Sequence, residues 1–202
     1  MTQFVTPKGV AVWPSLNTPD TKFVAEGEYH TKLRIQAEDA APLIQQLEGI
    51  RDAYLAEAVR RDPKVKQYKM ADLYEEEVDD QGNLTGHYLF KFKQKAVIQT
   101  RSGSSLNMKV ALFDSQRSPT TAQIGGGSVL RIAGSAIGYA MPSTKMVGLS
   151  LRPSAVQVIQ LSSMGGASAD AFTIEDGFVA DDEDEPVAVT AGTSFNDDDS
   201  DF

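Results

Sequence analysis

The sequence contains no cysteine and only two histidines, His30 and His87. The absence of cysteine excludes disulfide scaffolds, thiolate zinc sites and cysteine nucleophiles, and two isolated histidines do not form a zinc motif. No apolar run approaches the roughly 18 residues that a membrane span needs. The first residues also lack the apolar segment of a signal peptide. We therefore expect a cytoplasmic protein with no membrane contact, no metal and no cofactor.

Motifs for catalysis are missing as well. The run Gly125-Gly126-Gly127 lacks a following Gly-Lys-Ser or Gly-Lys-Thr, so it is not a phosphate-binding loop. There is no G-x-S-x-G nucleophile motif. The acidic turn at residues 77–80 fails the calcium-loop pattern, because Tyr88 stands where the bidentate glutamate is needed. The sequence therefore predicts a protein that is not an enzyme.

Basic residues are absent from the last quarter of the chain. Residues 153–202 hold none of the 19 Lys and Arg but 12 of the 28 Asp and Glu. The 16 remaining acidic residues leave residues 1–152 with a net charge of +3, so the overall charge of −9 describes neither part. From about Ser162 the composition is too poor in apolar residues to offset the entropy of ordering. We predict a domain over residues 1–161 and a disordered acidic tail over residues 162–202.

Alternating patterns predict that the first part is mostly β. Residues 29–36 place apolar side chains on one face and basic side chains on the other, which is typical of a half-buried strand. Residues 88–100 and 106–113 alternate in the same way, and a hairpin connection at Arg101–Ser105 joins them. Further candidate strands lie at residues 128–140, 145–151 and 155–161.

One long helix is predicted over residues 39–61, with Asp39 as its N-cap and Asp62-Pro63 as its end. The polar residues 62–83 read as a loop. Gly134 and Gly138, inside a candidate strand, indicate bulges or a barrel corner. These elements predict a mostly β fold: an OB-fold, that is, a five-stranded antiparallel barrel, with an inserted α-helix.

Basic side chains recur on the outer faces of the predicted strands. Lys91, Lys93 and Lys95 are spaced by two, so they project to one side, and Lys32 and Arg34 share a face of the earlier strand. Such a row is often only a solvated face that protects a sheet edge. Binders of single strands instead combine a positive groove with aromatic side chains on which bases stack. The full set of DNA-binding candidates is Lys32, Arg34, Lys91, Lys93, Lys95, Arg101, Lys109, Phe113 and Arg131.

Phe113 is the aromatic candidate in that set. It shares a face with Lys109, opposite the apolar face that runs from Leu106 to Leu112, so we expect it to be exposed. Tyr88, Phe90 and Phe92 continue into apolar positions and are expected to face the core. The alternation does not place Trp13, which precedes a proline.

The acidic tail ends in an aromatic residue. A solubilising extension gains nothing from a terminal phenylalanine, whereas a docking peptide uses the ring as an anchor and its carboxylates against a basic rim. The predicted partner-binding residues are Asp197, Asp198, Asp199, Asp201 and Phe202.

Several stretches give the chain a resemblance to a known family. They are residues 13–23 (WPSLNTPDTKF), residues 27–29 (GEY) leading into a strand, and residues 148–159 (GLSLRPSAVQVI). Together with the acidic tail ending in Phe, their order resembles the single-stranded DNA-binding proteins of T7-like bacteriophages. The helix at 39–61 and the loop at 62–83 depart from that family.

The resemblance implies an OB-fold that coats single-stranded DNA without strong sequence preference during phage DNA replication, recombination and repair. It also implies a tail that contacts the phage DNA polymerase and helicase/primase, a homodimer, and a location in the cytoplasm of the infected bacterium. Two alternatives stay open. One is a protein-interaction or recombination-mediator module without DNA affinity, and the other is a nuclease whose carboxylates bind Mg²⁺.

Overall fold

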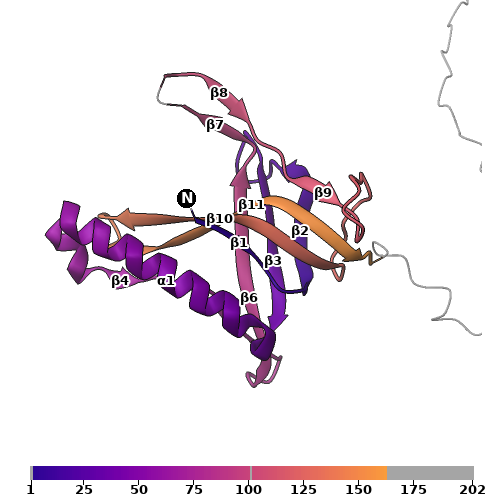
Figure 1. Ribbon diagram of the computed structural model, residues 1–202, viewed down its shortest axis with the longest axis horizontal. Coiled ribbons are helices and arrows are strands. Elements are labelled where there is room, and N and C mark those ends of the chain that lie inside the picture. Colours follow the sequence, from indigo (N-terminus) through magenta and orange to yellow (C-terminus); the bar gives the residue numbers. More distant parts are fainter. Residues whose placement is uncertain (1, 101, 163–202) are drawn as a thin grey trace, which may run out of the picture. The chain divides into compact units, whose positions relative to one another are not determined.

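The computed structural model describes residues 2–100 and 102–162, and the tail predictions for residues 163–202 lie outside that part (Figure 1). Strands dominate this described part, and it contains a single α-helix, which follows the third strand. The elements are β1 (Thr2–Val5), β2 (Gly9–Asp20), β3 (Glu28–Gln36), α1 (Ala37–Arg61), the 3-10 helix η1 (Pro63–Gln67), β4 (Lys69–Met70), β5 (Glu75–Val78), β6 (Leu84–Lys95), β7 (Val97–Gln99), β8 (Ser105–Asn107), β9 (Ala111–Phe113), β10 (Val129–Met141) and β11 (Met146–Gln160).

Five strands pair in a closed circuit. β2 pairs with β3, β3 with β6, β6 with β11, β11 with β10, and β10 returns to β2. The prediction of a mostly β OB-fold with an inserted helix is confirmed. One link departs from the expected antiparallel pattern, because β6 and β11 run parallel and are joined by the single pair Leu151 and Phe92.

The core lies inside this circuit and follows the predicted alternation. On β3, every second side chain from Tyr29 to Ile35 is buried, and the intervening side chains lie on the outer face. On β6, Phe90 and Phe92 are completely buried. Burial of a large apolar side chain stabilises the fold by about 1.5–3 kcal/mol, so the alternation fixes which face of each strand turns inward.

Helix α1 begins two residues earlier than predicted. Gln36 occupies the N-cap position without a side-chain hydrogen bond, so the prediction of Asp39 as N-cap was wrong. Asp39 instead lies in the first turn, where a carboxylate interacts favourably with the helix dipole. The predicted end is confirmed, since Asp62 follows the last helical residue and Pro63 begins η1.

The two predicted glycine bulges have different outcomes. The register of β10 and β11 shifts between Ala133 and Gly134, so a bulge lies there. At Gly138 the pairing is regular, and the ring of Tyr54 from α1 packs directly against the glycine. Gly138 therefore allows the helix to approach the sheet, which requires a position without a Cβ.

A second, smaller core holds the C-terminal end of α1. It consists of Ala58, Val65 and Val147, with Tyr54 and Tyr68 among the partly buried residues packed on it. It joins α1, η1 and the tip of the β10–β11 hairpin, which meet at the left of Figure 1. The predicted polar loop at 62–83 was wrong, because this stretch contains η1, β4 and β5.

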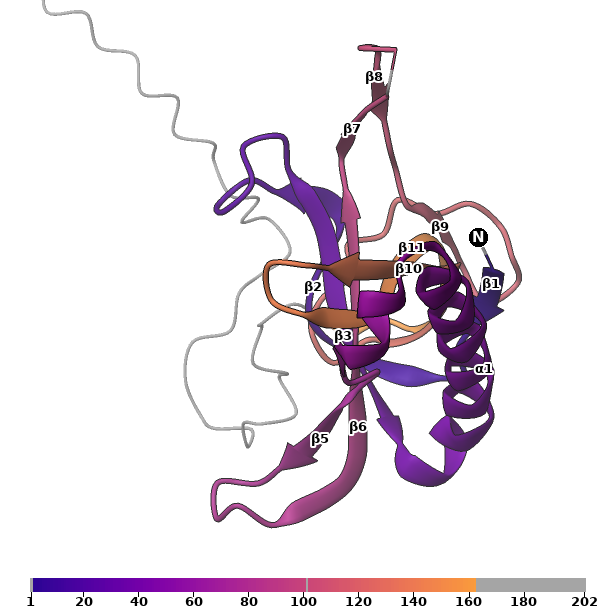
Figure 2. The same ribbon diagram turned by 90° about the vertical axis from the view of Figure 1, so that its left-hand side faces the viewer.

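The strand predicted over residues 106–113 is split in the structure. Its first part, β8, pairs with β7 in a hairpin that projects from the sheet, as Figures 1 and 2 show. Its last part, β9, pairs in parallel with β11. The predicted strands at 145–151 and 155–161 form one continuous strand, β11. No helix in the described part of the chain is long and apolar enough to span a bilayer.

Candidate nucleic-acid interface

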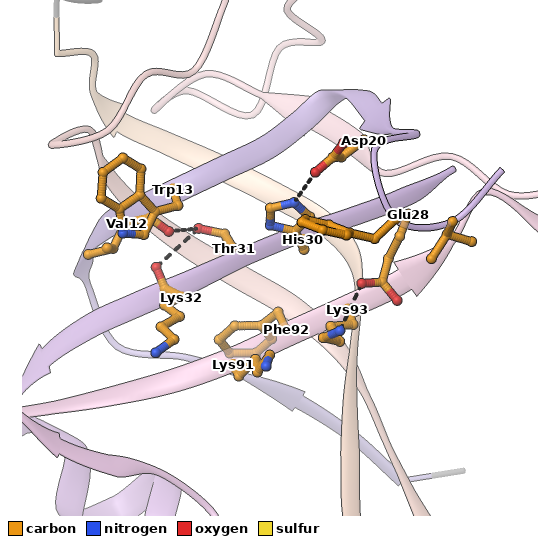
Figure 3. Close-up of a pocket in the computed structure, with 12 residues that line it drawn as sticks. Val12, Trp13, Asp20, Glu28, His30, Thr31, Lys32, Lys91, Phe92 and Lys93 are labelled. Carbon is orange, nitrogen blue, oxygen red and sulfur yellow. Dashed lines mark hydrogen bonds and ion pairs between the residues drawn. The ribbon is translucent and has the colours of Figure 1, made fainter. Parts of the chain in front are cut away.

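A groove of about 410 Å³ crosses the outer face of β2, β3 and β6 (Figure 3). Aromatic, basic and acidic side chains from the three strands and from the loop after β2 surround it. The lining residues are Val12, Trp13, Asp20, Phe23, Val24, Glu28, His30, Thr31, Lys32, Lys91, Phe92 and Lys93. The groove therefore lies on the face that the sequence predicted to be basic.

Trp13 stands at one side of the groove because β2 bulges there. Val12 is the partner of Lys32 and Ser15 is the partner of His30, so Trp13 and Pro14 together oppose the single residue Thr31. Proline has no N–H to give to a ladder, which suits this position. Trp13 adopts a positive φ of 50°, rare for a bulky residue, and the residue is 81% exposed. The structure thus holds a large ring in solvent at the edge of the groove.

Phe23 is the second exposed aromatic residue at the groove, and 85% of it is exposed. It lies in the loop between β2 and β3, where the Nζ of Lys22 stands 5.5 Å from its ring centroid. Asp20 accepts a hydrogen bond from the backbone N–H of Lys22 at 2.8 Å. That bond, followed by the contact with His30, lowers the pKa of Asp20. Phe23 was missing from the predicted site, and so was Trp13, because the alternation does not place that residue.

Three lysines line the groove, namely Lys32, Lys91 and Lys93, and they lie on the strand face that the sequence predicted to be basic. Lys32 and Lys91 are direct partners across β3 and β6, and His30 and Lys93 form the next pair on the same face. Lys95 follows, opposite Glu28, and Arg34 lies on the same face of β3 beyond Lys32. The structure therefore brings five of the predicted DNA-binding residues onto one face: Lys32, Arg34, Lys91, Lys93 and Lys95.

Carboxylates neutralise three of these five cations. The Nζ of Lys32 lies 2.6 Å from Glu75, and the Nζ of Lys93 lies 2.9 Å from Glu28. Arg34 donates its Nε hydrogen to both oxygens of Glu77, at 2.8 and 2.9 Å. Glu75 and Glu77 belong to β5, which pairs with β6 and lies alongside the basic face. Within residues 2–100 and 102–162, Lys91 and Lys95 form no ion pair.

Glu77 is held in its ionised form by this arrangement. Burial acts to raise its pKa, but hydrogen bonds from Thr85 and Arg34 and the nearby charges of Arg34 and His87 outweigh burial. The net result is a lowered pKa for Glu77. The pair of Arg34 and Glu77 is therefore ionic at neutral pH.

The other predicted DNA-binding residues lie elsewhere. Phe113 and Arg131 line a separate pocket of about 280 Å³ formed by β9, β10 and β11, which shares no lining residue with the groove. Phe113 is half-buried, and Arg131 donates a hydrogen bond to the carbonyl of Thr6. Lys109 is exposed between β8 and β9, so it does not share a strand face with Phe113. Arg101 lies outside the described residues.

No carboxylate cluster of the described chain resembles a catalytic metal centre. Among residues 2–100 and 102–162, no group of three or more His, Asp or Glu side chains is arranged to hold a metal ion. What the groove offers is exposed aromatic rings beside cations. This arrangement can bind a polyanion that carries flat apolar groups.

Comparison with known proteins shows which fold the chain has. No family model matches the sequence, and a search of curated proteins found no match either. Among solved structures, the single-stranded DNA-binding protein gp2.5 encoded by bacteriophage T7 superposes with a TM-score of 0.68 at 22% identity, over 89% of this chain and 99% of that one. The chain has the fold of a phage single-stranded DNA-binding protein. The resemblance inferred from the sequence is thus confirmed at the level of the fold.

Two further structures share this fold at lower similarity. The single-stranded DNA-binding protein of bacteriophage Enc34, truncated at its C-terminus, has a TM-score of 0.53 at 12% identity, over 80% of this chain and 87% of that one. The same protein in complex with single-stranded DNA also has a TM-score of 0.53 at 12% identity, over 81% and 89% of the two chains.

Proposed function

We propose that this chain binds single-stranded DNA without strong sequence preference and acts in the replication, recombination and repair of phage DNA. Its role is to coat the strand and keep it unpaired, without catalysis. Proteins of this fold from phages T7 and Enc34 are single-stranded DNA-binding proteins, and one of them has been solved with single-stranded DNA.

One observation carries the proposal. Trp13 and Phe23 are the most exposed large apolar side chains of the described chain, and both line the same groove. Exposure of a large ring normally costs free energy, since burial of its surface is favourable. Two such rings beside a row of lysines match the stacking platform and positive groove of single-strand binders.

The chemistry of binding follows from the two kinds of side chain. Lys91 and Lys95 neutralise backbone phosphates directly, and Lys32 and Lys93 do so by exchanging their carboxylate partners for phosphates. Release of counterions from the strand drives this step, so affinity falls as salt rises. Trp13 and Phe23 stack on bases, and every base offers a π-face, so this contact tolerates any sequence.

The acidic tail, residues 162–202, has two roles in this proposal. Its twelve carboxylates compete with DNA for the basic face, since tethering gives the tail an effective concentration on the order of millimolar. Its last residues, with Phe202 as the anchor, contact replication partners such as the phage DNA polymerase and helicase/primase. The chain acts as a homodimer in the cytoplasm of the infected bacterium.

Intrinsic fluorescence tests the proposal directly, because Trp13 is the only tryptophan in the sequence. Titration with a poly-pyrimidine oligonucleotide is expected to quench Trp13 emission in a saturable way, since the ring stacks on bases. Added salt is expected to reverse the quenching. A gel shift on the same samples, with and without Mg²⁺, measures binding independently and detects cleavage.

Each other candidate function predicts a different result. A protein-interaction module gives neither quenching nor a gel shift. A nuclease degrades the oligonucleotide only when Mg²⁺ is present. A gel shift without quenching of Trp13 would leave DNA binding intact but would move the binding surface away from the groove.

A further inference from the structure

A second cluster of cations lies at the C-terminal end of α1. Residues 60–69 carry five basic side chains and one carboxylate, a net charge of +4, which exceeds the +3 of residues 1–152 as a whole. Lys145, at the tip of the β10–β11 hairpin, joins them because its carbonyl accepts a hydrogen bond from the backbone N–H of Lys69 at 2.9 Å. We call this surface the distal patch; its members are Arg60, Lys64, Lys66, Lys69 and Lys145, all exposed.

The small core beneath the distal patch fixes its geometry. Val65 is buried against Ala58 and Val147, so the side chains of Lys64 and Lys66 on either side of it lie at the surface. The side chain of Asp62 accepts a hydrogen bond from the backbone N–H of Lys64, which holds the first turn of η1. The packed 3-10 helix η1 therefore holds Lys64 and Lys66 at the surface.

Among the residues that the structure describes, the cations of the distal patch lack the carboxylate partners that most cations on the groove face have. Three of the five cations on the groove face have carboxylate partners, as described above. In the described part of the chain, Arg60, Lys64, Lys66, Lys69 and Lys145 form no ion pair, and the neighbouring Arg61 alone pairs with Glu57. Unpaired cations held close together repel one another, and an anionic ligand relieves that repulsion.

The distal patch and the groove are linked by β11. Met146 pairs with Lys69, and Leu151 pairs with Phe92, which lies between Lys91 and Lys93. Five residues of strand span about 16 Å. A second cavity of about 360 Å³ lies between them, lined by Lys91 and Lys93 together with Tyr139, Leu149 and two carboxylates, Asp72 and Glu75. One long ligand can therefore touch both surfaces.

We propose that the distal patch is a second contact for the phosphate backbone of the same DNA strand that occupies the groove. This inference rests on the proposed function. A short strand fills the groove, and a longer strand continues over Lys91 and Lys93 to the lysines at the end of α1. The patch has no exposed aromatic ring, so it adds affinity and salt dependence without base contacts.

The test compares two oligothymidylates, one of about 5 nucleotides, near the lower end of the roughly 4–16 nucleotides that one OB-fold covers, and one of about 20 nucleotides, beyond its upper end. The full-length variant Lys66→Gln/Lys69→Gln is expected to bind the short strand as the wild type does. For the long strand its log–log salt slope is expected to be shallower by about 1.4, from about 0.7 per lost phosphate contact. When the salt concentration is raised fourfold, the factor by which affinity for the long strand falls is therefore about seven times smaller for the variant than for the wild type.

A matched control removes two exposed cations outside both surfaces, Lys8→Gln/Arg117→Gln, and is expected to leave both slopes unchanged. If Lys66→Gln/Lys69→Gln proves unstable on heating, a second variant, Lys64→Gln/Lys145→Gln, takes its place and is expected to show the same effect. An unchanged slope for the long strand overturns the inference. Equal weakening for both lengths also overturns it, and indicates that the patch holds the acidic tail instead. If the wild type binds neither strand, the proposed function fails as well.

Discussion

Glu28 and Glu75 are expected to weaken DNA binding, so their removal should strengthen it. Glu75 pairs with Lys32 at 2.6 Å and Glu28 pairs with Lys93 at 2.9 Å, and both lysines line the groove. In the variant Glu28→Gln/Glu75→Gln these two lysines lose their carboxylate partners. A phosphate then binds them without displacing another anion.

The size of the effect follows from the exposure of the pairs. The side chains of Lys93 and Glu75 are 45% and 56% exposed, so water and salt screen both pairs. An exposed ion pair is worth about 0.2–1 kcal/mol. Removing both carboxylates is therefore expected to tighten binding at low salt by about 2- to 30-fold.

The salt slope gives a second, independent readout. In the wild type a phosphate reaches Lys32 or Lys93 only by displacing a carboxylate. These two contacts therefore contribute less to the slope than those of Lys91 and Lys95, and the slope lies between about −1.4 and about −2.8. All four lysines are available in the variant, which brings the slope to about −2.8. Fluorescence anisotropy of a labelled oligothymidylate over a salt series measures both quantities.

A charge-matched control separates local from general electrostatics. Glu38→Gln/Asp52→Asn removes two exposed carboxylates from α1 and changes the net charge equally. It is expected to change affinity much less than Glu28→Gln/Glu75→Gln. Unchanged or weaker binding by the groove variant, in a protein that still unfolds cooperatively on heating, would refute the reasoning that these carboxylates compete with phosphates.

Three further predictions follow from the same surfaces. Trp13→Ala and Phe23→Ala are each expected to weaken DNA binding by about 1–3 kcal/mol, the usual contribution of base stacking, whereas Phe113→Ala, at a half-buried site, is expected to lower the melting temperature and leave the affinity unchanged. The lowered pKa of Glu77 stabilises the fold at pH above about 4.3, the usual value for unfolded Glu, and this contribution disappears as the pH falls through the lower folded value. In Glu77→Gln, the free energy of unfolding should therefore fall less steeply as the pH is lowered in the acid range. An identical acid dependence in variant and wild type would contradict this role of Glu77. Deletion of residues 165–202 is expected to tighten DNA binding, most at low salt where screening is weak, and equal affinities at low salt would show that the tail does not compete.

The parts of the fold that the sequence predicted depend on short-range periodicity. Alternation along residues 29–36 and 88–96 is set by burial of one face, so it identified both the core side and the lysine side of β3 and β6. The helix was predicted for the same reason, since its buried residues recur on one face.

The parts that were missed depend on contacts between distant residues. Glu75 and Glu77 lie 43 positions from the cations they pair with, so no local pattern reveals that β5 neutralises the groove. Exposure of Trp13 follows from a bulge that is defined only by the pairing of β2 with β3. A Trp-Pro pair inside a strand was the one available signal, because proline interrupts the ladder. Phe23, in a polar loop, gave a weaker signal of the same kind.

The single backbone pair between β6 and β11 has a consequence for motion. β10 and β11 are paired from Val129 to Met141, whereas a single backbone pair, Phe92 with Leu151, joins β6 and β11, and both of these side chains are buried. At this seam, the contact between β6 and β11, side-chain packing closes the circuit of strands where a ladder of backbone hydrogen bonds would otherwise do so. Local opening therefore costs less free energy at the seam than along β10. We expect amide hydrogens beside the seam to exchange with solvent before those of β10. Phe92 also lines the groove, so this weakly paired part of the sheet lies directly beside it.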